Sequence, residues 1–148
     1  RRHTRYWRDW SSDVCSSDLS KNWVSAVKHY ERISASNIYS GIQLELMGQT
    51  QGVKYTFTVN PKADPRQIIM EYEGLRRIKL NSNRLVLETS LGIVIEKEPY
   101  AYQIISGKLL KIECRYRLRG KRLSFEFPDK IAFPSSSAFI IIGLLEVP

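Results

Sequence analysis

Histidine and cysteine are scarce in this chain of 148 residues, which contains two of each. With so few potential ligands, neither a Cys/His zinc site nor a framework of disulfides is expected. The sequence also lacks an uninterrupted apolar run of the roughly 18 residues that a membrane-spanning helix needs. The best candidate, residues 138–145, is short and contains Gly143. We therefore expect no cofactor, no metal site and no membrane span.

The first 19 residues match the translation of a sequencing adapter. A common short-read sequencing adapter, translated in one frame, gives DWSSDVCSSDL, which is the sequence of residues 9–19. The same frame accounts for residues 1–5 and places the variable index bases of the adapter in the codons of residues 6–8. We therefore expect residues 1–19 to be a translated adapter artefact and residues 20–148 to be a fragment forming one domain. The alternative is a genuine tail rich in Ser and Asp.

The chain remains basic without this segment. Loss of four arginines and three aspartates lowers the formal net charge from +8 to +7. Only Cys114 and Trp23 remain of the two cysteines and three tryptophans. A single cysteine cannot form an internal disulfide, so the thiol content does not indicate a compartment. The length suits one domain with a modest core.

Polar and apolar residues alternate along most of the chain with the period of two that is typical of half-buried strands. Turn-forming residues separate these segments every eight to twelve residues or so, at about the spacing seen in sandwiches. The predicted strands are residues 42–47, 53–59, 67–72, 77–80, 84–89, 93–97, 101–105, 108–118 and 122–127. This pattern predicts an all-β fold, an antiparallel β-sandwich or rolled sheet of roughly 8–10 short strands. Two alternatives stay open for residues 131–148, a divergent closing strand or a misread sequence.

The register of the hairpin around Gly120 can be predicted from its side chains. A two-residue turn at Gly120 and Lys121, of the kind with glycine first, places the apolar residues of both strands on one face. The predicted pairs are Leu118 with Leu123, Tyr116 with Phe125, and Cys114 with Phe127. The opposite face then holds Lys111, Glu113, Arg115, Arg117, Arg119, Ser124 and Glu126. A shift of one residue would mix the two faces, so the pattern favours this register alone.

A basic row on the outer face of this hairpin is the candidate binding site. It consists of Arg115, Arg117, Arg119 and Lys111. Side chains two apart on a strand point the same way, about 6.5–7 Å from one to the next. Such a row can bind successive charges of an acidic polysaccharide or lipopolysaccharide. The alternative is that like charges keep a sheet edge from pairing. Nucleic acid is not expected, because the neighbouring aromatic residues face the core and offer no stacking surface.

Two pairs of glutamates are weaker candidates for chemistry. Glu71 and Glu73 are two residues apart, as are Glu96 and Glu98, and paired carboxylates hydrolyse glycosides when held about 5–9 Å apart. We expect both pairs to lie on exposed strand faces, solvated or balanced by Lys or Arg across the strands. No enzyme is predicted from them.

His29 and Asp64 also favour structural roles. Outside the first 19 residues, His29 has no second histidine or suitably spaced cysteine with which to form a triad or a zinc site. Asp64 precedes Pro65 in a turn, where an aspartate side chain usually accepts bonds from nearby backbone N–H groups. Calcium would require several more oxygen ligands than its neighbours supply.

Three runs of the sequence carry a resemblance to a domain family of unknown function. They are NIYSGIQL (37–44), VKYTFTVNPKADP (53–65) and IMEYEG (69–74). The family typically has N-x-Y-P-G-I-D-L, then L-x-Y-D-F-x-V-x-P-G-A-D-P, then I-x-L-x-F-x-G. Later landmarks are LVLET (85–89), Gly92, KEPYAYQ (97–103) and RYRL (115–118), so that the resemblance spans residues 30–127.

This resemblance implies a location and neighbouring domains, and it supplies no catalytic residues. Such domains commonly lie ahead of SBBP-type β-propeller repeats or β-sandwich modules in large secreted or surface proteins, often of Bacteroidetes with a type IX secretion tail. The chain departs from the pattern at Ser40, where proline is usual, and at Gln43 and Thr56, where aspartate is frequent. The expected function is a non-catalytic structural or adhesive β module whose partners are other domains of the same secreted or cell-surface chain. The alternative is a carbohydrate- or polyanion-binding module that uses the basic strand face.

Overall fold

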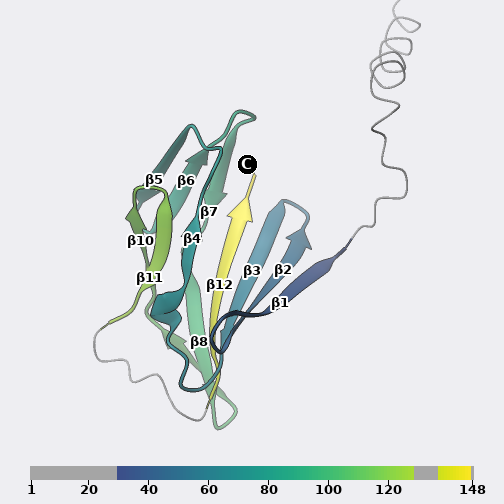
Figure 1. Cartoon of the computed structure of the whole chain (residues 1–148), viewed down its shortest axis with the longest axis vertical. Coiled ribbons are helices and arrows are strands. Elements are labelled where there is room, and N and C mark those ends of the chain that lie inside the picture. The colour runs from purple at the N-terminus through teal and green to yellow at the C-terminus, as the bar shows by residue number, and fades with distance from the viewer. Residues whose placement is uncertain (1–29, 129–136, 148) are drawn as a thin grey trace, which may run out of the picture. The chain divides into compact units, whose positions relative to one another are not determined.

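Twelve β-strands in two sheets form the part of the chain that this computed structural model describes, residues 30–128 and 137–147 (Figure 1). All strand pairs are antiparallel, which confirms the predicted all-β class, with more strands than expected. The predicted adapter segment, Trp23 and His29 lie outside the described residues.

The nine-stranded sheet has the order β1-β2-β3-β12-β7-β6-β5, with β8 and β9 continuing beside β12. Its strands are β1 (Arg32–Tyr39), β2 (Ile42–Gln49), β3 (Gly52–Val59), β5 (Arg77–Asn81), β6 (Arg84–Glu88), β7 (Ile93–Glu96), β8 (Tyr100–Ile105), β9 (Lys108–Ile112) and β12 (Phe139–Glu146). The three-stranded sheet has the order β10-β11-β4. Its strands are β4 (Ile69–Glu71), β10 (Arg115–Arg119) and β11 (Arg122–Glu126), and the 3-10 helix η2 (Pro65–Gln67) precedes β4.

The core lies between the two sheets. Phe57 of β3 and Phe125 of β11 meet edge to face with ring centroids 6.0 Å apart, which joins the large sheet to the small one. Phe127 and Phe139 meet similarly at 5.3 Å. These contacts place the inward residues of both sheets in one hydrophobic core, as in a β-sandwich.

Strand β12 occupies the middle of the large sheet. It pairs with β3 along its whole length, and its other side pairs with β8 and then β7. Alternate residues Phe139 and Ile141 are buried. The C-terminal segment forms this strand from Phe139 to Glu146, and residues 129–136 and 148 are outside the described region.

The prediction of one strand over residues 108–118 is wrong, because the chain changes sheets within it. β9 pairs with β8 in the large sheet, whereas β10 pairs with β11 in the small one. The side chain of Asn83 lies at this corner, accepting from the N–H of Tyr116 at 2.8 Å and donating to the carbonyl of Cys114 at 3.4 Å. Inward and outward side chains keep alternating through the corner, so the period of two gives no sign of it.

The predicted hairpin register is confirmed in the ladder. Tyr116 pairs with Phe125 and Leu118 with Leu123. Gly120 has a φ of +61° and Lys121 is not left-handed, as a turn with glycine first requires. Cys114 and Phe127 are both buried but lie beyond the ends of the paired strands.

Strand β1 is present although the sequence did not predict it. Its side chains are exposed on both faces until Tyr39, so it has no alternating pattern. A register shift interrupts its pairing with β2 between Ala35 and Tyr39, where Asn37 adopts a φ of +55°. Irregularities of this kind are common on edge strands.

Candidate functional site: a buried carboxylate beside an apolar groove

Glu96, the last residue of β7, is completely buried, with 0% of its surface exposed. The expectation that Glu96 lies on an exposed strand face is therefore wrong, whereas Glu98 is exposed as expected. Glu96 pairs with Leu85 of β6, which is also fully buried, and Ile93 of the same strand is exposed instead. The Glu96 side chain thus points into the core, whereas hydrophobicity alone would place the neighbouring isoleucines there.

Three tyrosine hydroxyls surround this carboxylate. Those of Tyr55 and Tyr116 donate to Oε1, the second at 2.8 Å, and that of Tyr72 donates to Oε2. The hydroxyls of Tyr55 and Tyr116 are also 3.2 Å apart. Tyr55 belongs to β3 of the large sheet, Tyr116 belongs to β10 of the small sheet, and Tyr72 follows β4. Glu96 and the three tyrosines, here called the Glu96 cluster, therefore connect the two sheets.

The Glu96 cluster contains one acid and no base. Within the described residues, no Lys, Arg or His forms an ion pair with Glu96. Hydroxyl donors stabilise the ionised form of a carboxylate through charge-assisted hydrogen bonds. Burial, and next the nearby Glu96, raise the pKa values of Tyr55, Tyr72 and Tyr116 well above the usual value of 10.0. The three phenols consequently remain donors at any ordinary pH.

Alkaline titration is expected to reveal these three phenols. As pH rises through about 10, tyrosines of the unfolded chain lose protons while the three in the folded domain keep theirs, so stability falls. Three of the eight tyrosines should show no phenolate absorbance until the domain unfolds. Titration of all eight near the ordinary value, with the circular dichroism of the folded domain retained, would contradict the cluster.

Gly143 of β12 provides the space for Tyr55. The two residues are paired in the ladder, and a Cβ at position 143 would lie only 2.0 Å from Cζ and 2.2 Å from the hydroxyl oxygen of Tyr55. Any side chain here would displace the ring from Glu96. The glycine that interrupts the apolar C-terminal run is therefore part of the site.

An apolar groove with a volume of about 420 Å³ lies beside the cluster, and Tyr55 and Tyr72 contribute to both. The other lining residues are Ile38, Tyr39, Leu44, Leu46, Phe57, Ile69, Met70 and Leu145. The small sheet is narrower than the large one, and in Figure 1 β1, β2 and β3 extend to the right of β4. The inward residues Leu44 and Leu46 of β2 are consequently only half-buried. The groove lies where the sandwich is incompletely closed.

Several residues of the recognised sequence runs build this groove. The Tyr39 hydroxyl donates to the carbonyl of Ile69 at 2.9 Å and accepts from its N–H at 3.2 Å, which holds β4 beside the end of β1. Gly41, with a φ of +72°, permits the close turn against Ala63, whose Cβ would be 2.9 Å from a Cβ at position 41. The NIYSGIQL run thus contributes Ile38, Tyr39 and Leu44 to the lining of the groove.

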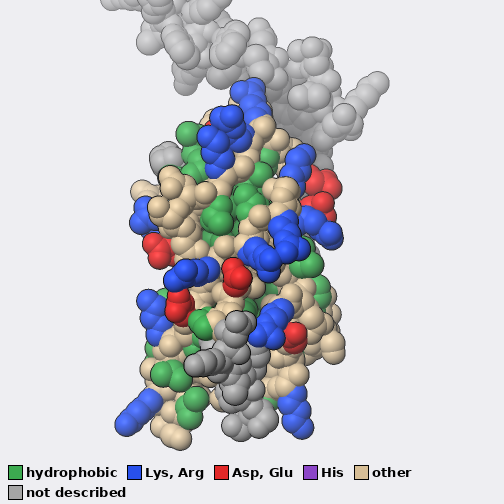
Figure 2. All heavy atoms as spheres, turned by 90° about the vertical axis from the view of Figure 1, so that its left-hand side faces the viewer, with side chains coloured by type: hydrophobic (Ala, Val, Ile, Leu, Met, Phe, Trp, Pro, Cys, Tyr) green, Lys and Arg blue, Asp and Glu red, His purple; other side chains and the backbone are tan. Residues whose placement is uncertain are grey.

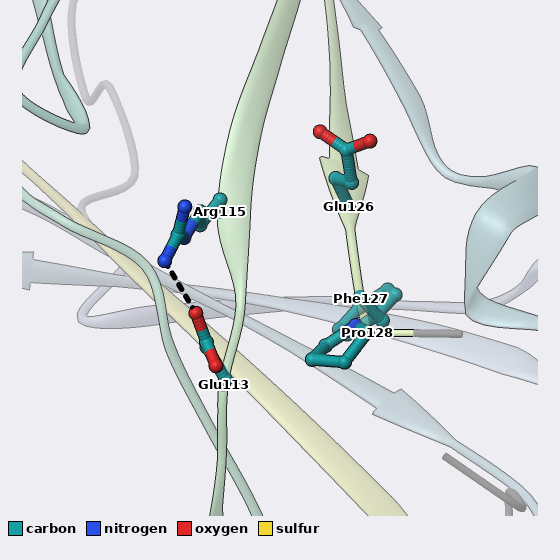
Figure 3. Close-up of a pocket in the computed structure, with 5 residues that line it drawn as sticks. All are labelled: Glu113, Arg115, Glu126, Phe127 and Pro128. Atoms are coloured by element: carbon teal, nitrogen blue, oxygen red, sulfur yellow. Dashed lines mark hydrogen bonds and ion pairs between the residues drawn. The ribbon is translucent and has the colours of Figure 1, made fainter. Parts of the chain in front are cut away.

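In the structure, acidic side chains lie beside part of the basic row. Arg115 forms an ion pair with Glu113 at 2.6 Å and lies opposite Glu126 in the ladder. Figure 3 shows Arg115 and Glu113 joined at a hollow of about 430 Å³, whose other lining residues are Glu126, Phe127 and Pro128. Arg115 therefore has an acidic partner beside it.

Arg117, Arg119 and Lys111 of the predicted row are exposed, and none of the three forms an ion pair in the described part of the chain. Lys111 does not join the two arginines, because it lies on β9 of the large sheet, with its Nζ 5.5 Å from the ring centroid of Tyr100. Figure 2, which views the left-hand side of Figure 1, shows Lys and Arg side chains with acidic ones between them. β10 is also an edge strand of the small sheet, where unpaired like charges discourage pairing.

The other residues considered as candidate sites have contacts that suit structural roles. Asp64 accepts from the N–H of Arg66 at 2.9 Å, which confirms its predicted capping role. Glu71 and Glu73 are exposed as expected, and Glu71 is 3.7 Å from Arg122 across the strands. Burial raises the pKa of the Cys114 thiol to about 12, so it is a poor nucleophile.

Comparison with known families places the chain among domains of unknown function. Residues 11–141 match DUF7948, a domain of unknown function. The chain belongs to this family. The DUF7948 match contains the whole Glu96 cluster and begins within the first 19 residues of the chain. No curated protein and no solved structure matches the chain.

The described residues of the DUF7948 domain were searched for metal sites and for membrane-spanning helices. In that region, no group of three or more His, Cys, Asp or Glu side chains is placed to hold a metal ion. The same region contains no helix of the length and hydrophobicity needed to cross a bilayer.

Proposed function

We propose that this DUF7948 domain is a non-catalytic structural or adhesive β module of a secreted, multidomain bacterial surface protein. The observation that best supports this proposal is that Glu96 is buried and hydrogen-bonded to residues of the core. It is the one fully buried carboxylate among the described residues, and both of its oxygens accept from tyrosines that reach it from both sheets. A carboxylate that is completely buried and bound by three tyrosines suits a structural role, since a substrate cannot reach it from solvent.

The proposed setting of the domain comes from its resemblance to modules of large surface proteins. We infer that it lies ahead of SBBP-type repeats or other β modules, and that those domains are its main partners. Sequencing the gene in both directions from the codon of Ser20 tests this. A secretion signal upstream and β modules downstream are expected. An open reading frame for a single cytoplasmic domain, or fusion to an enzyme domain, would overturn the proposal.

The adapter hypothesis predicts that residues 1–19 contribute nothing to stability. A chain that begins at Ser20 is expected to unfold at the same temperature as the full chain, because translated adapter residues were never selected to pack. Thermal unfolding of the two chains provides the comparison. A loss of more than about 1 kcal/mol on removal would show that the segment belongs to the fold.

Polyanion binding is the second candidate function, and the exposed pair Arg117 and Arg119 favours it. Both lie on the outer face of β10, and Arg119 is paired with Arg122 of β11. Their positive charges suit a sulfated or phosphorylated polymer, and exposed charges of this kind bind more weakly as salt rises.

Retention on heparin and on immobilised lipopolysaccharide across a salt gradient tests this second candidate. The double variant Arg117→Ser/Arg119→Ser is expected to elute at lower salt than the parent domain. Glu113→Ser/Arg115→Ser is the matched control, because it removes an ion pair from the same face without changing the net charge. If the double variant and the parent elute together, the arginines serve only to protect the edge of the sheet.

A further inference from the structure

The chemistry of the apolar groove restricts what can bind there. None of its ten lining residues is charged, and four of them are aromatic: Tyr39, Tyr55, Phe57 and Tyr72. Its volume of about 420 Å³ is that of a small-molecule site. A cation is attracted to aromatic rings within about 6 Å of their centroids, and more strongly where water is excluded.

The groove offers few hydrogen bonds to a polar ligand. Its three hydroxyls are already engaged, that of Tyr39 with the backbone of Ile69, and those of Tyr55 and Tyr72 with Glu96. A sugar would lose its bonds to water without replacing them, which costs free energy. The occupant must therefore present an apolar surface.

The charge of Glu96 distinguishes between apolar ligands. Glu96 lies behind Tyr55 and Tyr72, which line the groove, and no cation balances it within the described residues. A buried charge acts over a longer distance than an exposed one, because the surrounding dielectric constant is low. The groove is thus unfavourable for an anion and favourable for a cation that can shed its water.

We propose that this groove binds an organic cation with an apolar body, of the quaternary ammonium class. Its methyl or aryl groups contact the side chains of Leu44, Leu46 and Met70. Its positive charge is stabilised by the rings of Tyr39 and Tyr72, which are half-buried, and by Glu96 behind Tyr72. The ligand needs no hydrogen bond from the groove, which is consistent with the engaged hydroxyls.

The charge requirement is tested with two ligands of the same shape. Choline and 3,3-dimethylbutan-1-ol differ only in the replacement of the quaternary nitrogen by carbon. Titration of the whole domain, followed by NMR, is expected to show choline binding at least about fivefold more tightly. Signals of residues along β2 should shift. Equal affinity for the two ligands, or no binding of either, would overturn the proposal.

Variants at Ile38 and at Glu96 show whether electrostatic attraction causes the preference for choline. Ile38 lies at the rim and is 36% exposed, so Ile38→Lys can be introduced without disturbing the core, with Ile38→Gln as its neutral control. Ile38→Lys is expected to weaken choline binding severalfold and to leave the neutral ligand unchanged, whereas Ile38→Gln should affect both ligands alike. Glu96→Gln should reduce the preference for choline and leave the part that the aromatic rings contribute. If that variant does not fold, the Ile38 pair still decides, and a choline affinity insensitive to Ile38→Lys would contradict binding in this groove.

Discussion

Replacement of Glu96 by alanine is expected to lower the free energy of unfolding by about 3–5 kcal/mol. Three buried or half-buried phenols would lose their acceptor, and each unsatisfied buried donor costs about 1–3 kcal/mol. The removed side chain also leaves a cavity. The total stays below the simple sum because the hydroxyls of Tyr55 and Tyr116, 3.2 Å apart, can pair with each other.

Urea unfolding of Glu96→Ala beside Glu98→Ala measures this effect. Glu98 is exposed, so its replacement should change stability by no more than about 0.5 kcal/mol. Equal stability of the two variants would mean that the carboxylate of Glu96 is not buried.

Phe125→Ala is expected to cost about 3–5 kcal/mol, a large part of the stability of an ordinary domain. Phe125 is only 4% exposed and packs against Phe57 of the large sheet and Tyr116 of its own hairpin, with centroids 6.0 and 5.7 Å away. Glu126→Ala, one residue further along the strand and exposed, is the matched control. Comparable unfolding curves for these two variants would show that the hairpin register is wrong.

The hairpin shows what the sequence could predict. Its register follows from side chains alone, because apolar residues share one face only when Tyr116 lies opposite Phe125. The strands β2, β3, β5 and β6 also follow from alternation and turn residues, close to their predicted bounds. These features are local, and a period of two describes them well.

Features that depend on contacts distant in the sequence were not predicted. The corner between β9 and β10 preserves alternation, so Lys111 was assigned to the same strand as the arginines. Glu96 was expected to be exposed because a carboxylate is rarely buried without partners. Its partners come from positions 55, 72 and 116, and no local pattern connects them. The sequence shows only a glutamate directly after three apolar residues of a predicted strand.

A double-mutant cycle between Glu96 and Tyr116 tests most directly whether the hydrogen bonds of the Glu96 cluster stabilise the contact between the two sheets. The four proteins are the parent domain, Glu96→Leu, Tyr116→Phe and the double variant, each unfolded in urea. Tyr116→Phe should cost about 1–3 kcal/mol in the parent and at least 1 kcal/mol less when Glu96 is leucine, because the hydroxyl then has no carboxylate to bind. Costs of Tyr116→Phe that agree within about 0.3 kcal/mol in the two backgrounds would contradict the account.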